Sequence, residues 1–380
     1  MHVVVFGAGY AGVTLTRSLE RSLPRDVSLT LIDESPNHLV QHEVHRAIRR
    51  PSIAEAIQLP LDSLFDRATV TTAHIESIDP DSKQARLDTG ETVEYDYGAI
   101  CLGADTAYYG LDGLKEHSIP LKRLEDADQI RSQVLDLLAA EEDGTVVVGG
   151  AGLSGIQVAG EIAALVDAED AADRIEVVLL EMMETVAPSF PEAFQQAVHD
   201  QLVDRDIRIR TGITVERATE TAIQTDSGAI DYDVFVWTGG IAGQQSLAGD
   251  RPLVRNDLRV NRSTFVLGDA ARAVDADGKP VPASASAAIR EAKVVGENLT
   301  ALVEHERSEE GGFEPRMKPY RFEVPGWIVS VGDGAVAQVG PKVLTGKPAK
   351  AMKATVGAGY LSSVRAIKQA VDLVEEELHA

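Results

Sequence analysis

The chain has 380 residues, of which 44% are hydrophobic, so it is long enough for two packed domains and is not expected to be mainly disordered. Its 60 acidic and 36 basic residues give a net charge of −24, which repels phosphate backbones and excludes an electrostatic reader of DNA or RNA. Only 11 of the basic residues are lysine. This composition favours a halophilic protein that stays soluble in concentrated salt, although an ordinary acidic enzyme also fits it.

The first strand is predicted at residues 3–6, which leaves no room for the basic region and apolar core of a secretory signal. The longest uncharged run, residues 144–160, is rich in glycine, so no segment is expected to span a bilayer. We therefore expect a cytoplasmic protein.

The first segment has the pattern of a strand, a glycine turn, a helix and a second strand. The helix is predicted at residues 13–23 and the second strand at residues 27–32, followed by Asp33. In such a unit the first glycine allows a tight turn, the second lets a pyrophosphate approach the backbone, and the third lets helix and strand pack closely. The acidic residue can accept hydrogen bonds from a ribose diol. The three glycines here are Gly7, Gly9 and Gly12.

The same pattern returns later in the chain. A strand at residues 145–148, a helix at 156–166 and a strand at 175–180 are predicted, and Glu181 follows the last strand. The glycines are Gly150, Gly152 and Gly155. One such loop is weak evidence, because glycine turns also serve as plain connectors. Two copies, each followed by an acidic residue, predict two dinucleotide sites, and flavin with nicotinamide is the common pairing.

The single cysteine, Cys101, lies in an apolar run that predicts a buried strand. It excludes an intrachain disulfide, a dithiol redox pair and a thiolate-bound metal cluster. His38, His42 and His45 are close in sequence, with Glu43 between them. Their spacing alone allows a metal site, but further ligands at helical spacing are missing, so we expect polar packing and no metal.

Seven motifs together resemble the type II NADH:quinone oxidoreductases, a family of flavoproteins with two dinucleotide-binding folds. They lie at residues 7–12, 37–43, 101–106, 120–127, 146–161, 237–240 and 266–270, so the resemblance covers nearly the whole chain. It implies an α/β fold of two Rossmann-like domains, with the NADH domain inserted in the FAD domain, and a C-terminal tail region.

The implied domain limits follow from the same resemblance. The FAD-binding domain would comprise residues 1–105 and 252–315, and the NADH-binding domain residues 106–251. Residues 316–380 would cover the flavin and dock on the membrane. The implied activity is that of a non-proton-pumping NADH dehydrogenase, which takes hydride from NADH onto FAD and passes electrons to a quinone.

The resemblance also implies roles for individual residues. The FAD positions are Gly7, Gly9, Gly12, Asp33, Ala104 and Asp269, and the NADH positions are Gly150, Gly152, Gly155, Glu181 and Gly239. Gln157 and Glu161 would line the place where nicotinamide meets flavin, and Lys353 would offset negative charge on reduced flavin or quinol. Packing or solvated roles for Glu161 and Lys353 remain open. Glu181 would favour NADH over NADPH, because it repels a 2′-phosphate.

Two departures from the family pattern leave other functions open. The family usually has Glu where this chain has Gln157, and residues 285–292 lack both glutamines of the family's Ala-Gln-x-Ala-x-Gln-x-Gly pattern. The alternatives are a soluble NADH-dependent reductase of a small electron carrier and a flavin-binding redox sensor with little turnover. The lone cysteine argues against disulfide reductases and sulfide:quinone oxidoreductases.

The tail reverses the charge of the chain. Residues 334–371 contain six basic and no acidic side chains. Seven apolar residues could form one side of this segment: Leu344, Met352, Val356, Tyr360, Leu361, Val364 and Ile367. With them, residues 342–368 predict docking on an anionic membrane, at the cytoplasmic face of the cell membrane. The alternative is that this basic face packs on the acidic remainder of the protein. The glycines of the segment are expected to weaken any continuous helix here. A homodimer is a further possible assembly.

Overall fold

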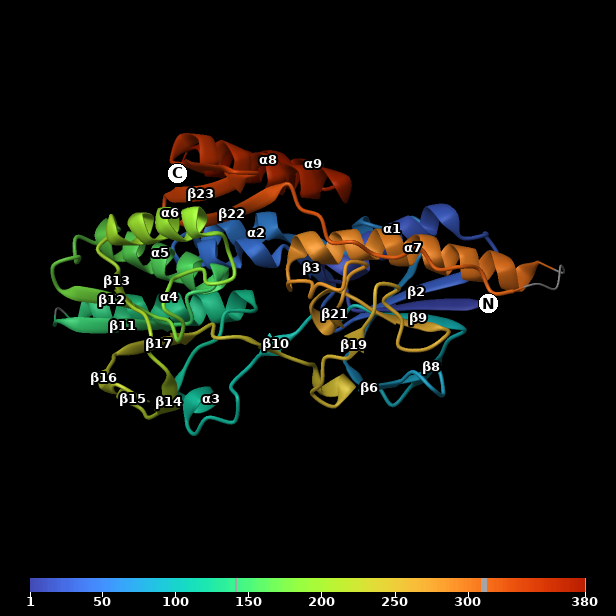
Figure 1. Ribbon diagram of the computed structural model, residues 1–380, viewed down its shortest axis with the longest axis horizontal. Coiled ribbons are helices and arrows are strands. Elements are labelled where there is room, and N and C mark those ends of the chain that lie inside the picture. The colour runs from blue at the N-terminus through green and yellow to red at the C-terminus, as the bar shows by residue number, and fades with distance from the viewer. Residues whose placement is uncertain (141, 309–312, 380) are drawn as a thin grey trace. The chain divides into compact units, whose positions relative to one another are not determined.

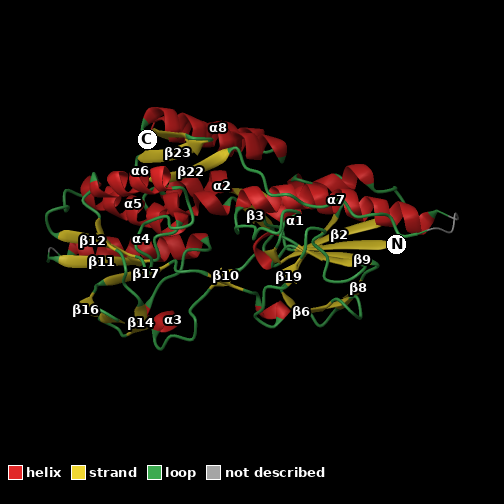
Figure 2. Ribbon diagram, in the orientation of Figure 1, coloured by secondary structure: helices red, strands yellow, loops and turns green. Residues whose placement is uncertain are grey.

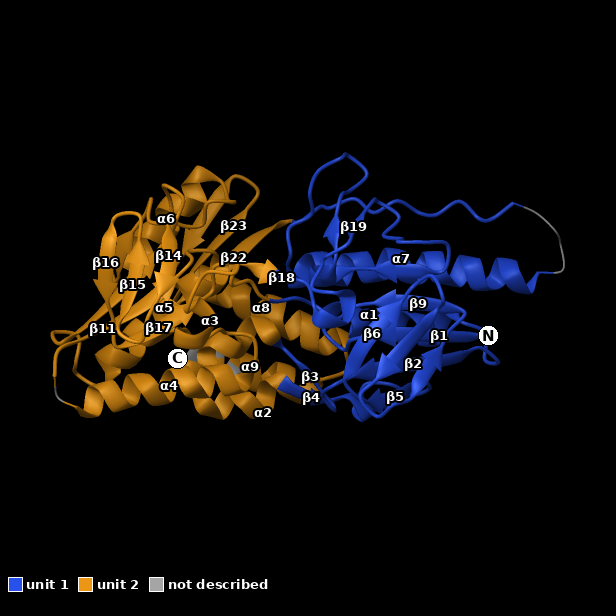
Figure 3. Ribbon diagram, turned by 90° about the horizontal axis from the view of Figure 1, so that it is seen from below, with its two compact units in different colours: residues 1–40, 58–105, 242–324 blue, residues 41–57, 106–241, 325–380 orange. Residues whose placement is uncertain are grey.

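The computed structural model describes residues 1–140, 142–308 and 313–379. The chain forms two compact units (Figure 3). Unit 1 comprises residues 1–40, 58–105 and 242–324, and unit 2 comprises residues 41–57, 106–241 and 325–380. In each unit strands are layered with helices (Figure 2), as the predicted α/β class requires.

Unit 1 is built on a parallel sheet whose central strand is the β-branched segment at the start of the chain. The strand order is β20 (Thr264–Val266), β9 (Tyr97–Ile100), β1 (His2–Phe6), β2 (Ser28–Asp33) and β5 (Thr69–Thr72). All of their pairings are parallel. The register aligns Phe6 with Ile32, so the glycine turn and the acidic residue both follow at the same edge of the sheet.

Two helices, α1 (Tyr10–Ser22) and α7 (Ala285–Arg307), lie side by side over this sheet (Figure 1). A Cβ added to Gly296 of α7 would lie 3.0 Å from the Ser18 hydroxyl oxygen of α1, so a small residue permits this close contact. The other elements of unit 1 are short. They are β3 (Asn37–Leu39), β4 (Gln58–Pro60), η3 (Leu61–Ser63), β6 (Ile75–Asp79), β7 (Gln84–Leu87), β8 (Thr92–Glu94), η4 (Gln245–Leu247), β19 (Leu253–Val254), η5 (Gly268–Ala270) and β21 (Arg272–Ala273).

Unit 2 repeats the design. Its parallel sheet has the order β13 (Arg208–Arg210), β12 (Ile175–Leu180), β11 (Gly144–Gly149) and β17 (Val234–Trp237). Four of its helices come from the same part of the chain: α3 (Leu114–His117), α4 (Leu124–Ala139), α5 (Leu153–Ala168) and α6 (Glu192–Val203). A second, antiparallel sheet consists of β14 (Val215–Ala218), β15 (Ala222–Thr225) and β16 (Gly228–Asp231). The chain passes between the units at β10 (Asp105–Thr106) and β18 (Ile241–Ala242).

Unit 2 also contains a segment from early in the chain. The 3-10 helix η1 (Gln41–Ile48), η2 (Pro51–Ile53) and α2 (Ala54–Ile57) belong to it, and η1 packs against α4 and α5. Sequence patterns did not indicate this, because residues 41–57 sit between two stretches of unit 1.

Most of the predicted tail also belongs to unit 2. An antiparallel sheet of β22 (Gly326–Val331), β23 (Gly334–Val339) and β24 (Lys342–Thr345) is followed by α8 (Lys347–Ser363) and α9 (Ile367–His379). A Cβ at Gly160 of α5 would lie 2.4 Å from the backbone nitrogen of Gly332, so α5 touches the turn between β22 and β23 directly.

The expected apolar side of the tail is largely wrong. Leu361 is completely buried, and Leu344 and Met352 pack on a small alanine core within unit 2. Of the predicted set, Val356 and Ile367 are exposed, with 58% and 67% of their surfaces accessible. The glycines do not interrupt α8; a Cβ at Gly357 would come within 2.9 Å of Leu373, so its absence lets α9 approach. No helix in the described part of the chain is both long and apolar enough to cross a membrane.

Candidate functional site: two glycine loops and a buried polar cluster

The loop after β1 requires glycine at the first and third of its three glycine positions. Gly7 has φ +98°, and a Cβ there would lie 2.5 Å from the carbonyl oxygen of Cys101. A Cβ on Gly12 would lie only 1.8 Å from the carbonyl oxygen of Gly7. Backbone packing between turn, helix and strand therefore excludes any side chain at either position.

The loop after β11 has nearly the same geometry. Gly150 has φ +95°, and a Cβ on Gly155 would again lie 1.8 Å from the carbonyl oxygen of the first glycine. Gly239 lies beside this loop, because a Cβ on Gly150 would be 2.8 Å from its Cα atom. The hydroxyl of Thr238 donates to the carbonyl oxygens of Gly149 and Gly150, each at 3.0 Å, and so holds the loop in place.

The middle glycine of each loop is different. Gly9 has φ −72° and ψ −166°, Gly152 has φ −72° and ψ −179°, and any residue adopts such extended conformations. A Cβ on either would meet no atom within 4 Å. Neither torsion nor packing in the protein requires glycine here. The open space at the N-termini of α1 and α5 fits a pyrophosphate that must approach the backbone.

The acidic residues at the two strand ends are held against their loops. Asp33 accepts the backbone N–H of Ala8 at 2.5 Å, and Glu181 accepts the backbone N–H of Ala151 at 2.8 Å. The second oxygen of Glu181 accepts the N–H of Met183 at 2.9 Å. A carboxylate oxygen can accept more than one hydrogen bond, so both groups fit a ribose diol placed beside the pyrophosphate.

In unit 1 a hollow of about 90 Å³ opens beside Asp33. The other residues that line it are Glu34, His74, Ile75, Leu102, Gln244 and Ser246. The ring of His74 lies 3.1 Å from a carboxylate oxygen of Glu34.

Asp269, the last of the predicted FAD residues, lies on η5 directly after Gly268. A buried carboxyl, Glu291 of α7, accepts the N–H of Gly268 at 2.6 Å. Burial, together with the nearby charge of Asp269, raises the pKa of Glu291 to about 8, so this group is mainly protonated at neutral pH. Sequence reasoning missed Glu291, although an acidic residue among the alanines of this helix was a usable signal. Ala104 is half-buried after β9.

Two of the three predicted catalytic residues contact one segment of unit 2, residues 43–49, and the third is linked to it through Ser330. Lys353 of α8 lies with its Nζ atom 3.4 Å from Glu43. Glu161 of α5 accepts from Arg49 at 2.8 Å. Gln157 of α5 donates from Nε2 to the hydroxyl oxygen of Ser330 at 3.3 Å, and that hydroxyl lies 2.8 Å from His45 Nε2.

This cluster is buried and highly charged. Burial opposes ionisation of Glu43, but the charges of Lys353, His42 and Arg46 outweigh it and hold the pKa of that carboxyl well below its usual range. Burial and the Lys353 ammonium lower the pKa of His45 far below that of a free histidine, so His45 is neutral. The cluster therefore combines an ionised carboxylate, a lysine ammonium and a neutral imidazole.

Arg49 connects the cluster to the β22–β23 turn. Its guanidinium bonds Asp333 at 2.5 Å as well as Glu161, and these carboxylates raise its pKa despite burial. The same contacts lower the pKa of Asp333, although burial acts against this. Sequence reasoning missed Arg49 and Ser330, since neither residue type marks a site without its neighbours.

The three histidines fall in different units. His38 belongs to unit 1, where its Nδ1 atom lies 2.8 Å from the carbonyl oxygen of Ala8, whereas His42 and His45 belong to unit 2. Within residues 1–140, 142–308 and 313–379 the structure shows no group of three or more His, Cys, Asp or Glu side chains arranged to hold a metal ion.

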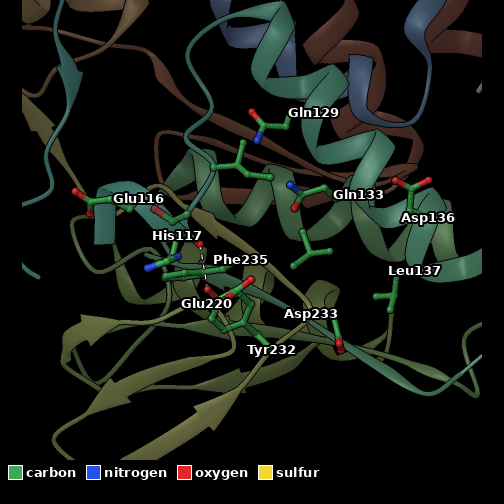
Figure 4. Close-up of a pocket in the computed structure, with 13 residues that line it drawn as sticks. Glu116, His117, Gln129, Gln133, Asp136, Leu137, Glu220, Tyr232, Asp233 and Phe235 are labelled. Carbon is green, nitrogen blue, oxygen red and sulfur yellow. Dashed lines mark hydrogen bonds between the residues drawn. The ribbon is translucent and has the colours of Figure 1, made fainter. Parts of the chain in front are cut away.

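A cavity of about 430 Å³ also lies in unit 2, between α4 and the start of β17 (Figure 4). Phe235 is one of the apolar residues that line it, and four carboxylates also line it, those of Glu116, Asp136, Glu220 and Asp233. None of the predicted site residues lines it.

Comparisons with known proteins agree with this geometry. A family model described as pyridine nucleotide-disulphide oxidoreductase matches residues 1–292. A curated protein of Staphylococcus aureus named type II NADH:quinone oxidoreductase is 24% identical and is covered over 93% of both chains.

Two solved structures are similar to the whole chain. One is described as NDH2 from Plasmodium falciparum in complex with NADH; it has a TM-score of 0.83 and 14% identity, and the match covers 99% of this chain and 97% of that one. The other is the sulfide:quinone oxidoreductase of Aquifex aeolicus, with a TM-score of 0.78, 20% identity and coverage of 96% and 91%. At such identities these likenesses show the fold.

Proposed function

This chain belongs to the pyridine nucleotide-disulphide oxidoreductase family, and we propose that it is an FAD-dependent NADH:quinone oxidoreductase. FAD would bind to the Gly7–Gly12 loop of unit 1, and NADH to the Gly150–Gly155 loop of unit 2. The S. aureus relative is named for this activity, and the similarity extends over nearly its whole length, which supports the proposal.

The observation that carries this proposal is the pair of unexplained glycines. Gly9 and Gly152 have ordinary torsions and open space where a Cβ would project, so a bound group that approaches the backbone would account for their small size. Each lies at a helix N-terminus, beside an acidic residue that fits a ribose. Two equivalent cradles in one chain suit one resident and one exchanging dinucleotide.

The side chains near Glu181 favour NADH over NADPH. Glu181 would bond the ribose diol and repel a 2′-phosphate, and the next two residues, Met182 and Met183, offer no cation to receive one. Both methionines are exposed, with 64% and 51% of their surfaces accessible, so they are available to contact a base.

Each part of the chain has a defined task in the proposed reaction. When bound, FAD supplies the capacity to accept a hydride and release electrons. The N-termini of α1 and α5 bind pyrophosphate, and Asp33 and Glu181 orient the riboses. Gln157 and Glu161 project from α5, and the buried Lys353 ammonium would offset negative charge that develops during reduction.

Thiol chemistry has no place in this proposal. Cys101 is the single cysteine, it is buried, and burial raises the pKa of its thiol. A thiol in this environment is a poor nucleophile, and this chain cannot form a redox disulfide within itself.

Purification and steady-state kinetics test the proposed function. The protein should be yellow with non-covalent FAD and should oxidise NADH with a quinone more efficiently than with ferredoxin-like acceptors. A preparation that stays colourless after incubation with FAD would overturn the proposal. A clear preference for protein acceptors would favour the reductase of a small electron carrier.

One observation favours that second candidate. On α7, at the positions of the two missing glutamines, Ser286 and Arg290 are bonded to each other, with Arg290 donating to the serine hydroxyl at 2.5 Å. Arg290 adds a cation that suits an acidic carrier more than a neutral quinone. If Arg290→Gln lowers activity with an acidic carrier and not with quinones, the carrier is the acceptor.

Attachment to the cytoplasmic face of a membrane is a finer part of the proposal. Val356, Ile367 and Val371 of α8 and α9 are exposed by 58%, 67% and 50%, and Arg365 and Lys368 lie nearby in sequence. Liposome flotation of the parent and of Ile367→Asp, at low and high salt, tests it. If both proteins float equally, these helices are not the anchor; light scattering of the same samples shows whether the chain forms a homodimer instead.

A further inference from the structure

We propose that residues 43–49 position the proposed site: Glu43 holds the ammonium of Lys353, and His45, acting through Ser330, sets the orientation of the Gln157 amide. This inference rests on the proposed function and deepens it. It identifies three positioning residues, Glu43, His45 and Ser330, none of which is among the predicted catalytic or cofactor-binding residues.

The proposal has two parts, the Glu43 arm (Glu43 and Lys353) and the His45 arm (His45, Ser330 and Gln157). The Glu43 arm follows from burial and charge. Only 2% of the Glu43 side chain and 9% of the Lys353 side chain are accessible to solvent, and their charged atoms lie 3.4 Å apart. Lysine has a flexible stem and a compact charge, so a buried ammonium stays protonated and in one place only beside a fixed anion. Glu43 is such an anion, because Arg46 at 3.1 Å and His42 at 3.2 Å also bind it.

The His45 arm follows from the polarity of its hydrogen bonds. A neutral imidazole has one nitrogen that donates and one that accepts. If Nε2 accepts, the Ser330 hydroxyl donates its single proton to His45 at 2.8 Å, and the serine oxygen remains free to accept from Gln157 Nε2 at 3.3 Å. The two ends of an amide have almost the same shape, so hydrogen bonds of this kind decide which end points where. The oxygen of Gln157 is then directed away from Ser330.

The segment that carries both arms is itself fixed. Arg131 of α4 donates to the carbonyl oxygens of Ile48 and Arg49 at 3.0 and 2.9 Å. Arg49 bonds Glu161 and Asp333, and these contacts join the segment to α5 and to the β22–β23 turn. Residues that are held from three elements can define the geometry of the side chains they contact.

The first test is a double-mutant cycle on the His45 arm. Ser330→Ala removes one hydroxyl and is expected to lower kcat for NADH oxidation about tenfold, which corresponds to ~1.4 kcal/mol, with FAD content retained and KM for NADH within about twofold. In a Gln157→Leu background the same change should have no further effect. Ser330→Thr, which keeps the hydroxyl, should restore most of the activity.

A matched control separates positioning from general packing. Ser118 is another nearly buried serine of unit 2, and its hydroxyl donates to the carbonyl oxygen of Leu114, away from Gln157. Ser118→Ala should leave kcat unchanged within about twofold. Equal losses from both serine changes, or a Ser330→Ala loss that persists in the Gln157→Leu background, would overturn the His45 arm.

The second test follows the side chain of Lys353 by NMR of protein with lysines labelled at the ε-carbon and the signal assigned with Lys353→Arg. In Glu43→Gln this signal should move and broaden, because the buried ammonium loses the anion that holds it in one place. The other charged groups facing Glu43, namely Arg46 and His42, remain in this variant. In Glu43→Asp, which keeps the charge and folds more safely, the change should be smaller.

The outcomes are distinguishable from those of the proposed function. A parent protein that binds no FAD contradicts the proposed function, yet the Lys353 signal still reports on the Glu43 arm, and the signal of the Gln157 side-chain NH2 in Ser330→Ala still reports on the other arm. An unchanged Lys353 signal in Glu43→Gln, or an unchanged Gln157 signal, would overturn the corresponding arm.

Discussion

The two glycine loops have nearly the same backbone, but the side chains around them differ. In both, the third glycine lies against the carbonyl oxygen of the first, and the acidic strand end accepts the N–H of the residue after the first glycine. In unit 1 the acidic residue is Asp33, beside a polar hollow. In unit 2 it is the buried Glu181, followed by two exposed methionines. Backbone geometry thus defines what both loops can hold, and the surrounding side chains decide which dinucleotide each would select.

The largest expected effect comes from the third glycines. Gly12→Ala and Gly155→Ala each place a Cβ 1.8 Å from a carbonyl oxygen, so helix and turn must separate. We expect each to cost about 3 kcal/mol or more of unfolding free energy, measured by chemical denaturation. A variant of either kind that is as stable as the parent would show that the loop relaxes more easily than this packing implies.

The middle glycines should separate binding from folding. Gly9→Ala and Gly152→Ala are expected to keep the stability of the parent, since the added methyl group meets no protein atom within 4 Å. Gly9→Ala should weaken FAD binding, and Gly152→Ala should raise KM for NADH, each by at least about tenfold, or ~1.4 kcal/mol. Flavin content and NADH titration measure the two effects. If Gly152→Ala removes the flavin and Gly9→Ala does not, the two loops are assigned the wrong way round.

A smaller effect is expected at the acidic residue of unit 2. Glu181→Ser combined with Met182→Arg should lower the preference for NADH over NADPH by on the order of tenfold, because an anion is lost and a cation is gained beside the 2′ position. The ratio of kcat/KM for the two cofactors measures it. Asp33→Asn is the matched control in unit 1 and should leave this ratio unchanged.

The smallest expected effect concerns Glu291 of unit 1 and depends on pH. Its pKa in the folded protein is about 8, above the ordinary 4.5, so the folded state holds this proton more tightly than the unfolded state does. The stability that it contributes is therefore present below about pH 4.5 and is lost as pH rises through about 8. Glu291→Gln cannot ionise.

We expect the Tm of Glu291→Gln, taken relative to the Tm of the parent, to be higher at pH 8.5 than at pH 5 by about 2 °C or more. Thermal unfolding of the FAD-loaded proteins at the two pH values measures this. A Tm difference between variant and parent that does not change with pH would contradict the raised pKa.

The strand–turn–helix segments could be predicted from the sequence, but the residues at which their helices and strands begin and end were predicted less accurately. The strand of residues 175–180 was predicted at its observed limits, whereas α1 begins at Tyr10 and not at residue 13. The early start has a physical reason, since Gly9 is the last extended residue and the helix begins directly after it. Ala11 and Gly12 are also buried in α1, but they belong to the glycine motif, so apolar periodicity indicated the helix only from Val13.

The tail shows the limit of such reasoning. Leu361 and Ile367 have the same apolar character in sequence, yet Leu361 is completely buried and Ile367 is 67% exposed. Which residue is covered depends on how α8 and α9 pack against each other and on β23, and no pattern within the segment contains that information.

What the sequence by itself determined are the features that depend on neighbouring residues: the two strand–turn–helix units, their glycines and the acidic residue after each second strand. These follow from backbone torsion and from the periods of strand and helix, which are local properties. Only the tertiary structure decided that Glu43 reaches Lys353, that Arg49 reaches Glu161, and that His45 is linked to Gln157 through Ser330, each from a segment more than a hundred residues earlier in the chain. Burial and charge pairing select such contacts, and both are properties of the folded chain as a whole.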